Sequence, residues 1–374
     1  MNVHEVDDHN FKHESGEDLI KKSRHKIVST LIGGTLLAGS IVGGMPLLLK
    51  SKNLNRIEQL TESAKTLQKN RSFALSRSVD YFNQPNTIST QLEIPNSFYN
   101  EQYKDFNITP TWYQNFQNYG SNQLNSKFWN YDLGNGYNGW GNNEVENYTN
   151  NASNVRIQNG KLIIEATKQI NGDKITYQSA RVNTANKVNF QYGMFNMILK
   201  LPDGIGTWPA VWFLPQNRIY QNRLPANPLN NGEIDWTEAI GVQPNSVYSV
   251  AQAVNSNYFT PNEHDKVEHV PNDSSKFYDY TFQWTPNSLT FLLNGKVYYQ
   301  LIKKSNWNYI TWPYDQPFYL IINQALGGNW GGQDRAQYPP NGINNQALPA
   351  FMEIKSIAYY PYLGKNSLNF HFQK

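Results

Sequence analysis

Two asparagine–glycine pairs, each set between short apolar runs, narrow the range of folds open to this chain. The first, Asn159-Gly160, lies between the runs 155–157 and 162–164, and the second, Asn294-Gly295, divides residues 289–299 in the same way. Both residues of such a pair readily adopt the positive φ angles of a two-residue turn. Each pair therefore predicts a β-hairpin.

Further short runs rich in β-branched and aromatic residues predict more strands. They fall at 182–183, 190–200, 210–214, 233–239, 246–254, 278–284, 318–323 and 352–360. Many short strands, separated by Gly and Pro turns and without a long helical pattern, are typical of a sandwich or jelly roll. We expect an all-β domain over residues 108–362, a sandwich or a jelly roll, whose concave sheet face would offer a groove.

Three carboxylates, Glu233, Asp235 and Glu238, crowd one predicted strand of a chain that is only 16% charged. Side chains at i and i+2 share a face, so Glu233 and Asp235 point the same way and Trp236 points into the core. Glu238 has the opposite parity. A β-bulge near Thr237 would return it to the acidic face.

Two carboxylates about 5–5.5 Å apart are the equipment of a retaining glycosidase, one as nucleophile and one as acid/base. A third acid between them would drive their pKa values apart. The three acids could instead belong to a solvated edge strand or to a calcium loop, neither of which is catalytic. Calcium loops, however, carry more oxygen ligands close by. The polar stretch around His264 and His269 indicates a solvated loop more than a metal site. We expect the protein to bind neither a metal nor a cofactor.

The N-terminal region carries a separate pattern. A basic cluster at 21–26 precedes an uncharged run at 27–49, which is long enough to span a bilayer and favours a cytoplasmic N-terminus. We expect a cytoplasmic segment (1–26), a transmembrane signal-anchor (27–49), an extracellular stalk (50–107), a catalytic domain (108–362) and a tail (363–374). The alternative is a cleaved signal peptide, which would make the protein secreted.

Charge and cysteine content exclude some classes of protein. A net charge of +3 is too small to argue for nucleic-acid binding. Cysteine is absent, which excludes disulfides and thiolate metal sites. Aromatic residues make up 14% of the chain and suit either a β core or sugar stacking. We expect a monomer whose partners are a polysaccharide and, through the anchor, the cell membrane.

Several segments, in order along the chain, resemble glycoside hydrolases of family 16, in particular the laminarinase-like branch. They are 128–130, 140–149, 179–182, 206–215 with its Trp208-Pro209-Ala210-Val211-Trp212 run, 284–295, 317–323 and 327–330. With the acids at 233–238, the resemblance covers roughly residues 108–362. It implies a β-jelly-roll and hydrolysis by double displacement with retention.

The resemblance also implies roles for individual residues. Glu233 would be the nucleophile, Glu238 the acid/base, and Asp235 a partner that hydrogen-bonds to Glu233 and tunes it. The candidate sugar-binding residues are Asn143, Glu144, Arg181, Trp208, Trp212, Gln252, Asn323 and Trp330. Indoles can stack on pyranose rings, and Arg181 can donate two hydrogen bonds to hydroxyls. The alternatives are core packing for Trp212 and a surface position for Arg181.

The chain departs from the laminarinase-like pattern at several positions. Tyr248 and Gln252 stand on the strand where His is usual. Tyr278 replaces another His, and Gln324 replaces an aliphatic residue. We expect these changes on or near the groove, where they would alter the substrate. Lys355 occupies the position of a calcium-binding Asp, and because an ammonium cannot ligate a cation, we expect no calcium there.

The sequence thus predicts an exported endo-glycosidase that cleaves a β-glucan with 1,3 or mixed linkages. A transglycosylase that remodels a cell-surface polysaccharide would use the same site and remains an alternative. A catalytically silent carbohydrate-binding module would be expected to lose one of the acids, and this chain keeps all three. The long loop at 216–231 is either a wall beside the active strand or a surface loop.

Overall fold

The structure is a computed structural model that describes residues 102–107, 109–217, 231–253, 265–269, 275–364 and 371–372. All of them belong to one compact unit of the chain, residues 88–374. The predicted anchor, most of the predicted stalk, His264 and most of the 216–231 loop lie outside the described residues. No helix in the described ranges is long and apolar enough to cross a membrane.

One sheet has ten strands. They are β1 (Trp112–Asn115), β3 (Glu146–Tyr148), β4 (Val155–Gln158), β5 (Lys161–Asn171), β6 (Lys174–Ser179), β9 (Gly193–Lys200), β14 (Tyr278–Thr285), β15 (Ser288–Leu293), β16 (Lys296–Ile302) and β18 (Ala350–Tyr360). Their order is β16-β15-β14-β9-β18-β5-β6-β3, with β1 beside β18 and β4 beside β5. All pairs are antiparallel except β3 with β6.

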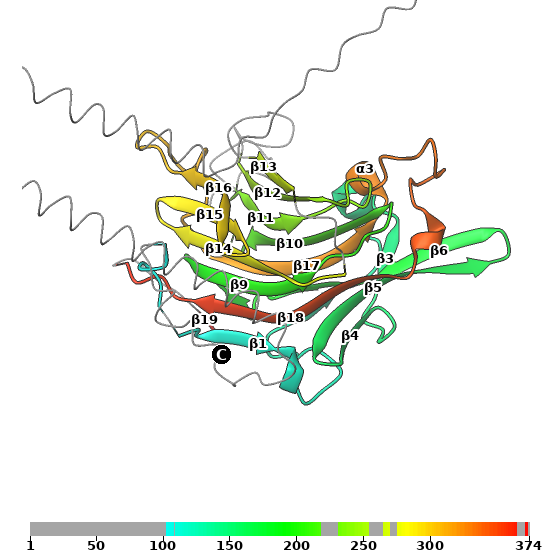
Figure 1. Cartoon of the computed structure of the whole chain (residues 1–374), viewed down its shortest axis with the longest axis horizontal. Helices are drawn as coiled ribbons and strands as arrows, with labels where there is room; N and C mark the ends of the chain where they lie inside the picture. Colours follow the sequence, from blue (N-terminus) through cyan, green and yellow to red (C-terminus); the bar gives the residue numbers. More distant parts are fainter. Residues whose placement is uncertain are drawn as a thin grey trace, which may run out of the picture. The chain divides into compact units, whose positions relative to one another are not determined.

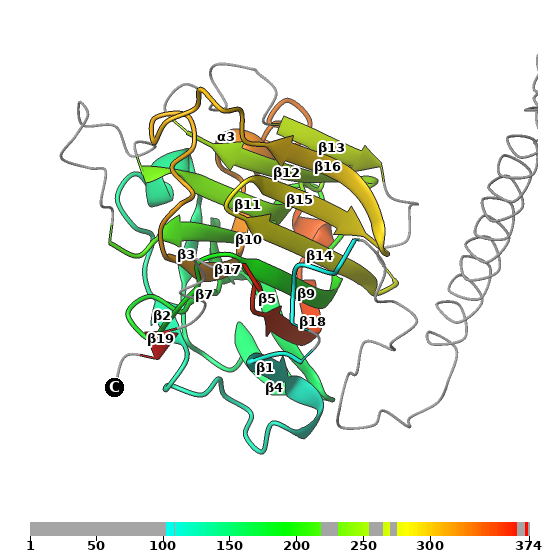
Figure 2. The same cartoon turned by 90° about the vertical axis from the view of Figure 1, so that its left-hand side faces the viewer.

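A second, seven-stranded sheet carries the acidic strand. Its strands are β2 (Asn130–Asp132), β7 (Arg181–Asn183), β10 (Thr207–Pro215), β11 (Glu233–Glu238), β12 (Ser246–Gln252), β13 (Asp265–His269) and β17 (Phe318–Leu326). They are ordered β13-β12-β11-β10-β17-β7-β2, so the acids lie on a central strand. Figures 1 and 2 show this sheet lying over the larger one.

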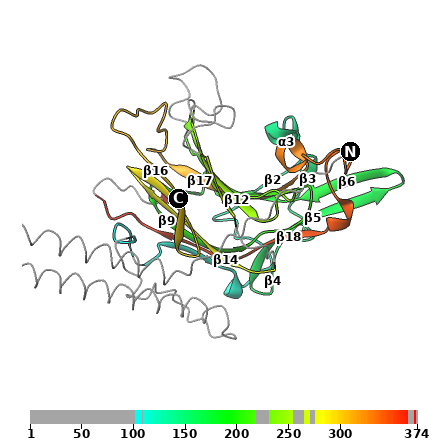
Figure 3. The same cartoon turned by 45° about the horizontal axis from the view of Figure 1, so that its top comes forward.

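Small elements complete the described part of the chain. They are the pair β8 (Val188–Asn189) and β19 (His371–Phe372), and the short turns η2 (Phe116–Asn118), η3 (Gly139–Asn143), α3 (Gly328–Gly331) and η6 (Asn345–Ala347). Figure 3 shows α3 near one end of the seven-stranded sheet, where it contacts η3, β10 and β17.

Both predicted hairpins are confirmed. Asn159-Gly160 joins β4 to β5 and Asn294-Gly295 joins β15 to β16, and all four turn residues have positive φ. The further strands predicted from the sequence are also confirmed, with ends that differ by a few residues. The strands that the sequence did not predict include β1, β2 and β3, which are too short for an alternating pattern to show, and β6, whose Ile175 and Tyr177 do alternate with polar residues.

The core lies between the two sheets and is largely aromatic. Phe195 of β9 packs against Phe213 of β10, with ring centroids 5.0 Å apart, and against Trp236 of β11 at 5.9 Å. Trp236 is 1% exposed, which confirms its predicted core position. Burying each such side chain contributes about 1.5–3 kcal/mol, so these contacts fix one face of β11 against the larger sheet and leave the other to the acids.

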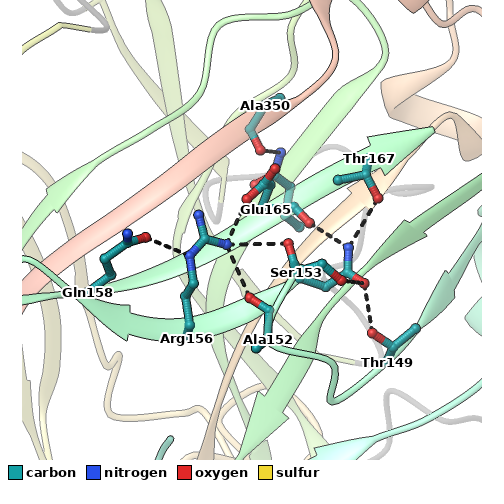
Figure 4. A network of polar contacts seen from close by, with 10 residues as sticks. Thr149, Ala152, Ser153, Arg156, Gln158, Glu165, Thr167 and Ala350 are labelled. Atoms are coloured by element: carbon teal, nitrogen blue, oxygen red, sulfur yellow. Dashed lines mark hydrogen bonds and ion pairs between the residues drawn. The ribbon is translucent and has the colours of Figure 1, made fainter. Parts of the chain in front are cut away.

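A polar network ties β4 to β5 on the larger sheet (Figure 4). Arg156 donates from Nη1 to Glu165 Oε2 at 2.6 Å and from Nε to Gln158 Oε1 at 2.7 Å. Asn154 donates from Nδ2 to the Glu165 carbonyl at 3.0 Å and to Thr167 Oγ1 at 3.2 Å. The network belongs to the larger sheet, whereas the acids of β11 lie on the smaller one.

Candidate active site

A bulge in β11 brings the three acids to one face, as the sequence predicts. Asp235 lies opposite Trp212, whereas Thr237, two residues further on, lies opposite Val211, the residue directly before Trp212 in β10. Trp236 is therefore the extra residue, and its side chain enters the core. The pairing with β12 shifts between Asp235 and Glu238 as well. An added residue changes the parity of everything after it, so Glu238 joins the acidic face.

Neutral donors hold the acids in place. Gln252 Nε2 donates to Glu233 Oε1 at 2.7 Å and to Asp235 Oδ2 at 2.9 Å. The indole Nε1 of Trp208 donates to Glu238 Oε1 at 3.0 Å. Gln252 and Trp208, both predicted to bind sugar, therefore contact the acids directly. Asp235 is buried, and it meets Glu233 through the shared Gln252 amide.

Burial raises the pKa values of both Glu233 and Glu238. It is the largest cause that raises the pKa of Glu233 to about 8, with the charge of Glu238 adding and Arg181 opposing. Burial also raises the pKa of Glu238 to about 7, and the charge of Glu144 adds to the effect. Because the two carboxyls interact, they lose their protons as a pair. The pair therefore retains a proton near neutral pH.

Arg181 lies between two indoles. Its guanidinium carbon is 4.6 Å from the ring centroid of Trp140 and 5.0 Å from that of Trp212, and its Nε donates to Asp132 Oδ2 at 3.0 Å. Arginine over an indole face is a favourable cation–π arrangement. Arg181 is thus part of the acidic face of the sheet, and its surface alternative is wrong. The Asp132 partner was not predicted from the sequence.

Three aromatic side chains pack together beside Glu238. Trp330 of α3 packs edge-on against Trp208, with ring centroids 5.5 Å apart, and against Tyr248 of β12 at 4.8 Å. Trp208 and Trp330 are half-buried, so part of each ring stays accessible. The predicted residue Asn143 lies at the same end, where its Nδ2 donates to Asn329 Oδ1 at 2.9 Å.

A buried polar chain runs behind Trp212. Its Nε1 donates to Asn323 Oδ1 at 2.8 Å, Asn323 Nδ2 donates to the Tyr148 hydroxyl at 3.1 Å, and Tyr148 donates to Glu144 Oε2 at 3.1 Å. Core packing was the alternative for Trp212, but the residue is only half-buried and its ring meets the Arg181 guanidinium. Tyr148 and the buried Glu146 were not predicted from the sequence to have a role. The alternating spacing of Glu144, Glu146 and Tyr148 nevertheless puts all three side chains on one face.

Two of the expected departures lie elsewhere, so their predicted place near the groove is wrong. Gln324 is fully buried and donates to the Ala350 carbonyl of β18, because it follows Asn323 and must point to the opposite face. Tyr278 belongs to β14 of the larger sheet and packs against the hydrophobic core. Tyr248 and Gln252 remain as departures on the acidic face.

The surroundings of Lys355 do not fit a calcium ion. Its Nζ lies 4.1 Å from the ring centroid of Phe277, and Lys161 and Lys200 both pair with Glu353, the nearby carboxylate. Calcium requires six to eight oxygen ligands, and three ammonium groups would repel it. The described residues also contain no group of three or more His, Asp or Glu side chains placed to hold a metal.

Removal of calcium is therefore expected to leave stability unchanged. A metal that binds only the folded state raises the melting temperature by mass action, and a chelator would reverse that gain. Thermal unfolding with EDTA, with EDTA followed by excess calcium, and with neither should give one Tm. A Tm that falls with EDTA and recovers with calcium would contradict this account of the Lys355 region.

A β-sandwich whose central strand presents interacting carboxylates, flanked by indoles and an arginine, has the organisation of a carbohydrate-active enzyme. The sequence pattern described as glycosyl hydrolases family 16 matches residues 142–339. The chain belongs to this family, and it is a glycoside hydrolase.

Individual relatives agree with the family match. A beta-glucanase of Rhodothermus marinus is 34% identical over 242 residues, which are 63% of this chain and 79% of that protein. Glucan endo-1,3-beta-glucosidase A1 of Niallia circulans is 32% identical over 264 residues, 63% of this chain but only 36% of that protein. The solved laminarinase from Rhodothermus marinus superposes with a TM-score of 0.61 at 31% identity, over 69% of this chain and 98% of that one. The likeness confirms the predicted jelly-roll class.

Proposed function

We propose that this glycoside hydrolase is a retaining endo-β-glucanase that cleaves internal bonds of a β-1,3 or mixed-linkage glucan. The observation that carries the proposal is the bulge of β11, which aligns Glu233, Asp235 and Glu238 on one face beside Trp208 and Gln252. The proposal includes the predicted roles of the three acids. The names of the relatives support the substrate class, since they include a beta-glucanase, an endo-1,3-beta-glucosidase and a laminarinase.

In the proposed first step, Glu233 attacks the anomeric carbon and Glu238 gives its proton to the departing glycosidic oxygen. One bond forms, from Glu233 to the sugar, and one breaks, from the sugar to the leaving chain. In the second step Glu238 takes a proton from water, whose oxygen displaces Glu233. The raised pKa of Glu238, about 7, suits both steps because the residue must give and then recover one proton.

Gln252 and Arg181 favour charge on Glu233 within this scheme. The amide of Gln252 donates to Glu233 Oε1, and the charge of Arg181 lowers the pKa of Glu233. Glu238 instead has a negative neighbour in Glu144, which favours its neutral form. Burial and the charge of Glu238 nevertheless leave the pKa of Glu233, about 8, above that of Glu238, about 7, and the Trp208 bond lowers the latter. The assignment of Glu233 as the nucleophile and Glu238 as the acid therefore rests on the family pattern.

A panel of polysaccharides tests the proposed activity. The full chain would be incubated with laminarin, mixed-linkage β-glucan, agarose and carrageenan, with reducing ends and product sizes followed over time. Short oligomers from laminarin or mixed-linkage glucan are expected. Products longer than the starting oligosaccharide would point to the transglycosylase, and cleavage of agarose or carrageenan alone would contradict the assigned substrate.

Loss of the Gln252 amide is expected to slow the reaction. In Gln252→Leu, Glu233 and Asp235 lose a shared donor at a buried site, which costs about 1.5–3 kcal/mol for a hydrogen bond to a charged group. We therefore expect kcat on the glucan to fall by about 10- to 100-fold. Gln300→Leu is the matched control, since Gln300 is exposed on β16 and donates to Thr290. Equal kcat in both variants would contradict the role of Gln252.

A further inference from the structure

A second pair of acids, Glu144 and Glu146, lies close to Glu238 and takes no part in the reaction described above. Both side chains are buried, and Glu146 is 0% exposed. Asn135 fixes the backbone of both, because its Nδ2 donates to the Glu144 carbonyl at 3.2 Å and to the Glu146 carbonyl at 2.7 Å. Two buried acids on one face are costly unless they share a proton or a function.

Hydrogen bonds assign the negative charge to Glu144. The indole of Trp212 can only donate, so Asn323 accepts with Oδ1 and turns its amide toward Tyr148. The Tyr148 oxygen accepts that bond, and its proton is directed to Glu144 Oε2. Asn142 Nδ2 donates to the other oxygen, Oε1, at 3.2 Å. Both oxygens of Glu144 therefore accept hydrogen bonds from neutral side chains, and an ionised carboxylate, which can only accept, matches that arrangement.

Glu146 has the opposite environment. Its Oε2 accepts from the Leu326 backbone N–H at 2.7 Å, but no donor in the described part of the chain reaches its buried Oε1. Burial raises the pKa of Glu146 well above its usual range, and the neighbouring Glu144 charge raises it further. A proton on Oε1, donated to the Glu144 carboxylate, satisfies both groups. The pair then carries a single negative charge.

One short turn connects this pair to Glu238. A Cβ added to Gly328 of α3 would lie 3.4 Å from Glu144 Cγ, and one added to Gly331 would lie 3.0 Å from Trp208 Cβ. Trp208 in turn donates to Glu238 Oε1. The α3 turn thus contacts Glu144 on one side and, on the other, the indole that donates to Glu238, and the charge of Glu144 raises the pKa of Glu238.

We propose that the Glu144–Glu146 pair keeps one fixed negative charge beside Glu238 and thereby holds Glu238 in the protonated form that the first step requires. The inference rests on the proposed function, in which Glu238 is the acid/base. Glu144 is then a positioning residue that acts through Glu238, instead of the sugar ligand predicted from the sequence. Glu146 supplies the proton that keeps the charge of the pair at one.

The other titratable groups near Glu238 come from its own strand and from β12. Glu233 and Asp235 lie on its own strand, and their shared donor Gln252 comes from β12. Tyr248, also from β12, lies opposite Glu238. Two arginines of the described part of the chain also face this region. Arg181 pairs with Asp132 and lowers the pKa of Glu233, and Arg335 donates from Nη2 to the Gly328 carbonyl of α3 at 2.6 Å.

The indole N–H of Trp208 offers a direct reading of the charge on Glu238, because it donates to that carboxyl. The full chain would be labelled with 15N-tryptophan, and the Trp208 resonance would be identified by its loss in Trp208→Phe. In the wild-type protein the resonance should titrate with a midpoint of about 7. In Glu144→Gln the midpoint should fall by about half a unit or more, since one like charge is removed.

Glu146→Gln is the matched variant. The glutamine amide can donate to Glu144 and its oxygen can accept from Leu326, as the protonated carboxyl does, so the Trp208 midpoint should stay at the wild-type value. An unchanged midpoint in Glu144→Gln, or a fall in Glu146→Gln equal to the fall in Glu144→Gln, would overturn the proposal. The reading requires no substrate, so it is independent of whether the proposed glucanase activity is found.

A measurement on the wild-type protein covers the case in which Glu144→Gln does not fold. With 13C-labelled glutamate side chains, the resonance that is lost in Glu146→Gln belongs to Glu146. It should keep the chemical shift of a protonated acid through the pH range in which the exposed glutamates ionise, because burial raises the pKa of Glu146. A carboxylate shift for Glu146 in step with the exposed glutamates would place a second charge in the pair and overturn the proposal.

Discussion

The Glu233→Ala variant is expected to lose hydrolysis of the glucan by on the order of 10⁴-fold or more, because removing a nucleophile eliminates the covalent path. The cavity left by the carboxylate should admit azide. With a substrate that has an activated leaving group, added azide should restore turnover and give a glycosyl azide of inverted configuration. Rates with and without azide, and the anomeric configuration of the product, check this result.

Glu165→Ala is the control for that variant. Glu165 is a carboxylate of the larger sheet that pairs with Arg156 and has no contact with the acids of β11. It should leave hydrolysis at the wild-type rate, and circular dichroism should show both variants folded. Full activity in Glu233→Ala would contradict its role as nucleophile.

Glu238→Ala is expected to show the second-largest effect, and the effect should depend on the leaving group. General acid catalysis contributes about 10²- to 10⁴-fold, so kcat/KM on the polysaccharide should fall by that factor. Aryl glycosides that leave without a proton should lose far less in the first step. Comparing the polymer with a dinitrophenyl glycoside measures the difference, and an equal loss on both substrates would show that Glu238 is not the acid.

The fold was predictable where local residues decide the structure. Asn159-Gly160 and Asn294-Gly295 specify their turns without help from the rest of the chain, and both hairpins form as expected. The bulge could also be inferred, because Glu238 can join Glu233 and Asp235 on one face only if β11 gains a residue. Parity along one strand is a local property, and it predicted the core position of Trp236 as well.

The partners of the acids were less accessible because they come from distant segments. Gln252 reaches Glu233 and Asp235 only through the register of β12 across the bulge. The carboxyl of Glu146 is positioned by the hydrogen bond that it accepts from the Leu326 N–H, and Leu326 lies on a strand far along the chain. β3 itself has three residues, too few for an alternating pattern to show.

The wrong placement of Gln324 near the groove could have been avoided from the sequence. Consecutive residues of a strand point to opposite faces, so Asn323 and Gln324 cannot both lie beside the acids. The family resemblance indicated an unusual residue at this position but not the direction of its side chain. Alternation along β17, applied from Asn323, would have placed Gln324 under the sheet, where it meets Ala350.

Glu233 and Glu238 together are expected to carry out a double displacement. Proton NMR of the first product released from a glucan oligosaccharide measures this outcome, because the anomeric signal reports configuration before mutarotation. The β-anomer should form first, and the α-anomer should rise only later. If the α-anomer forms first, a single displacement with inversion operates, and Glu233 is not a nucleophile.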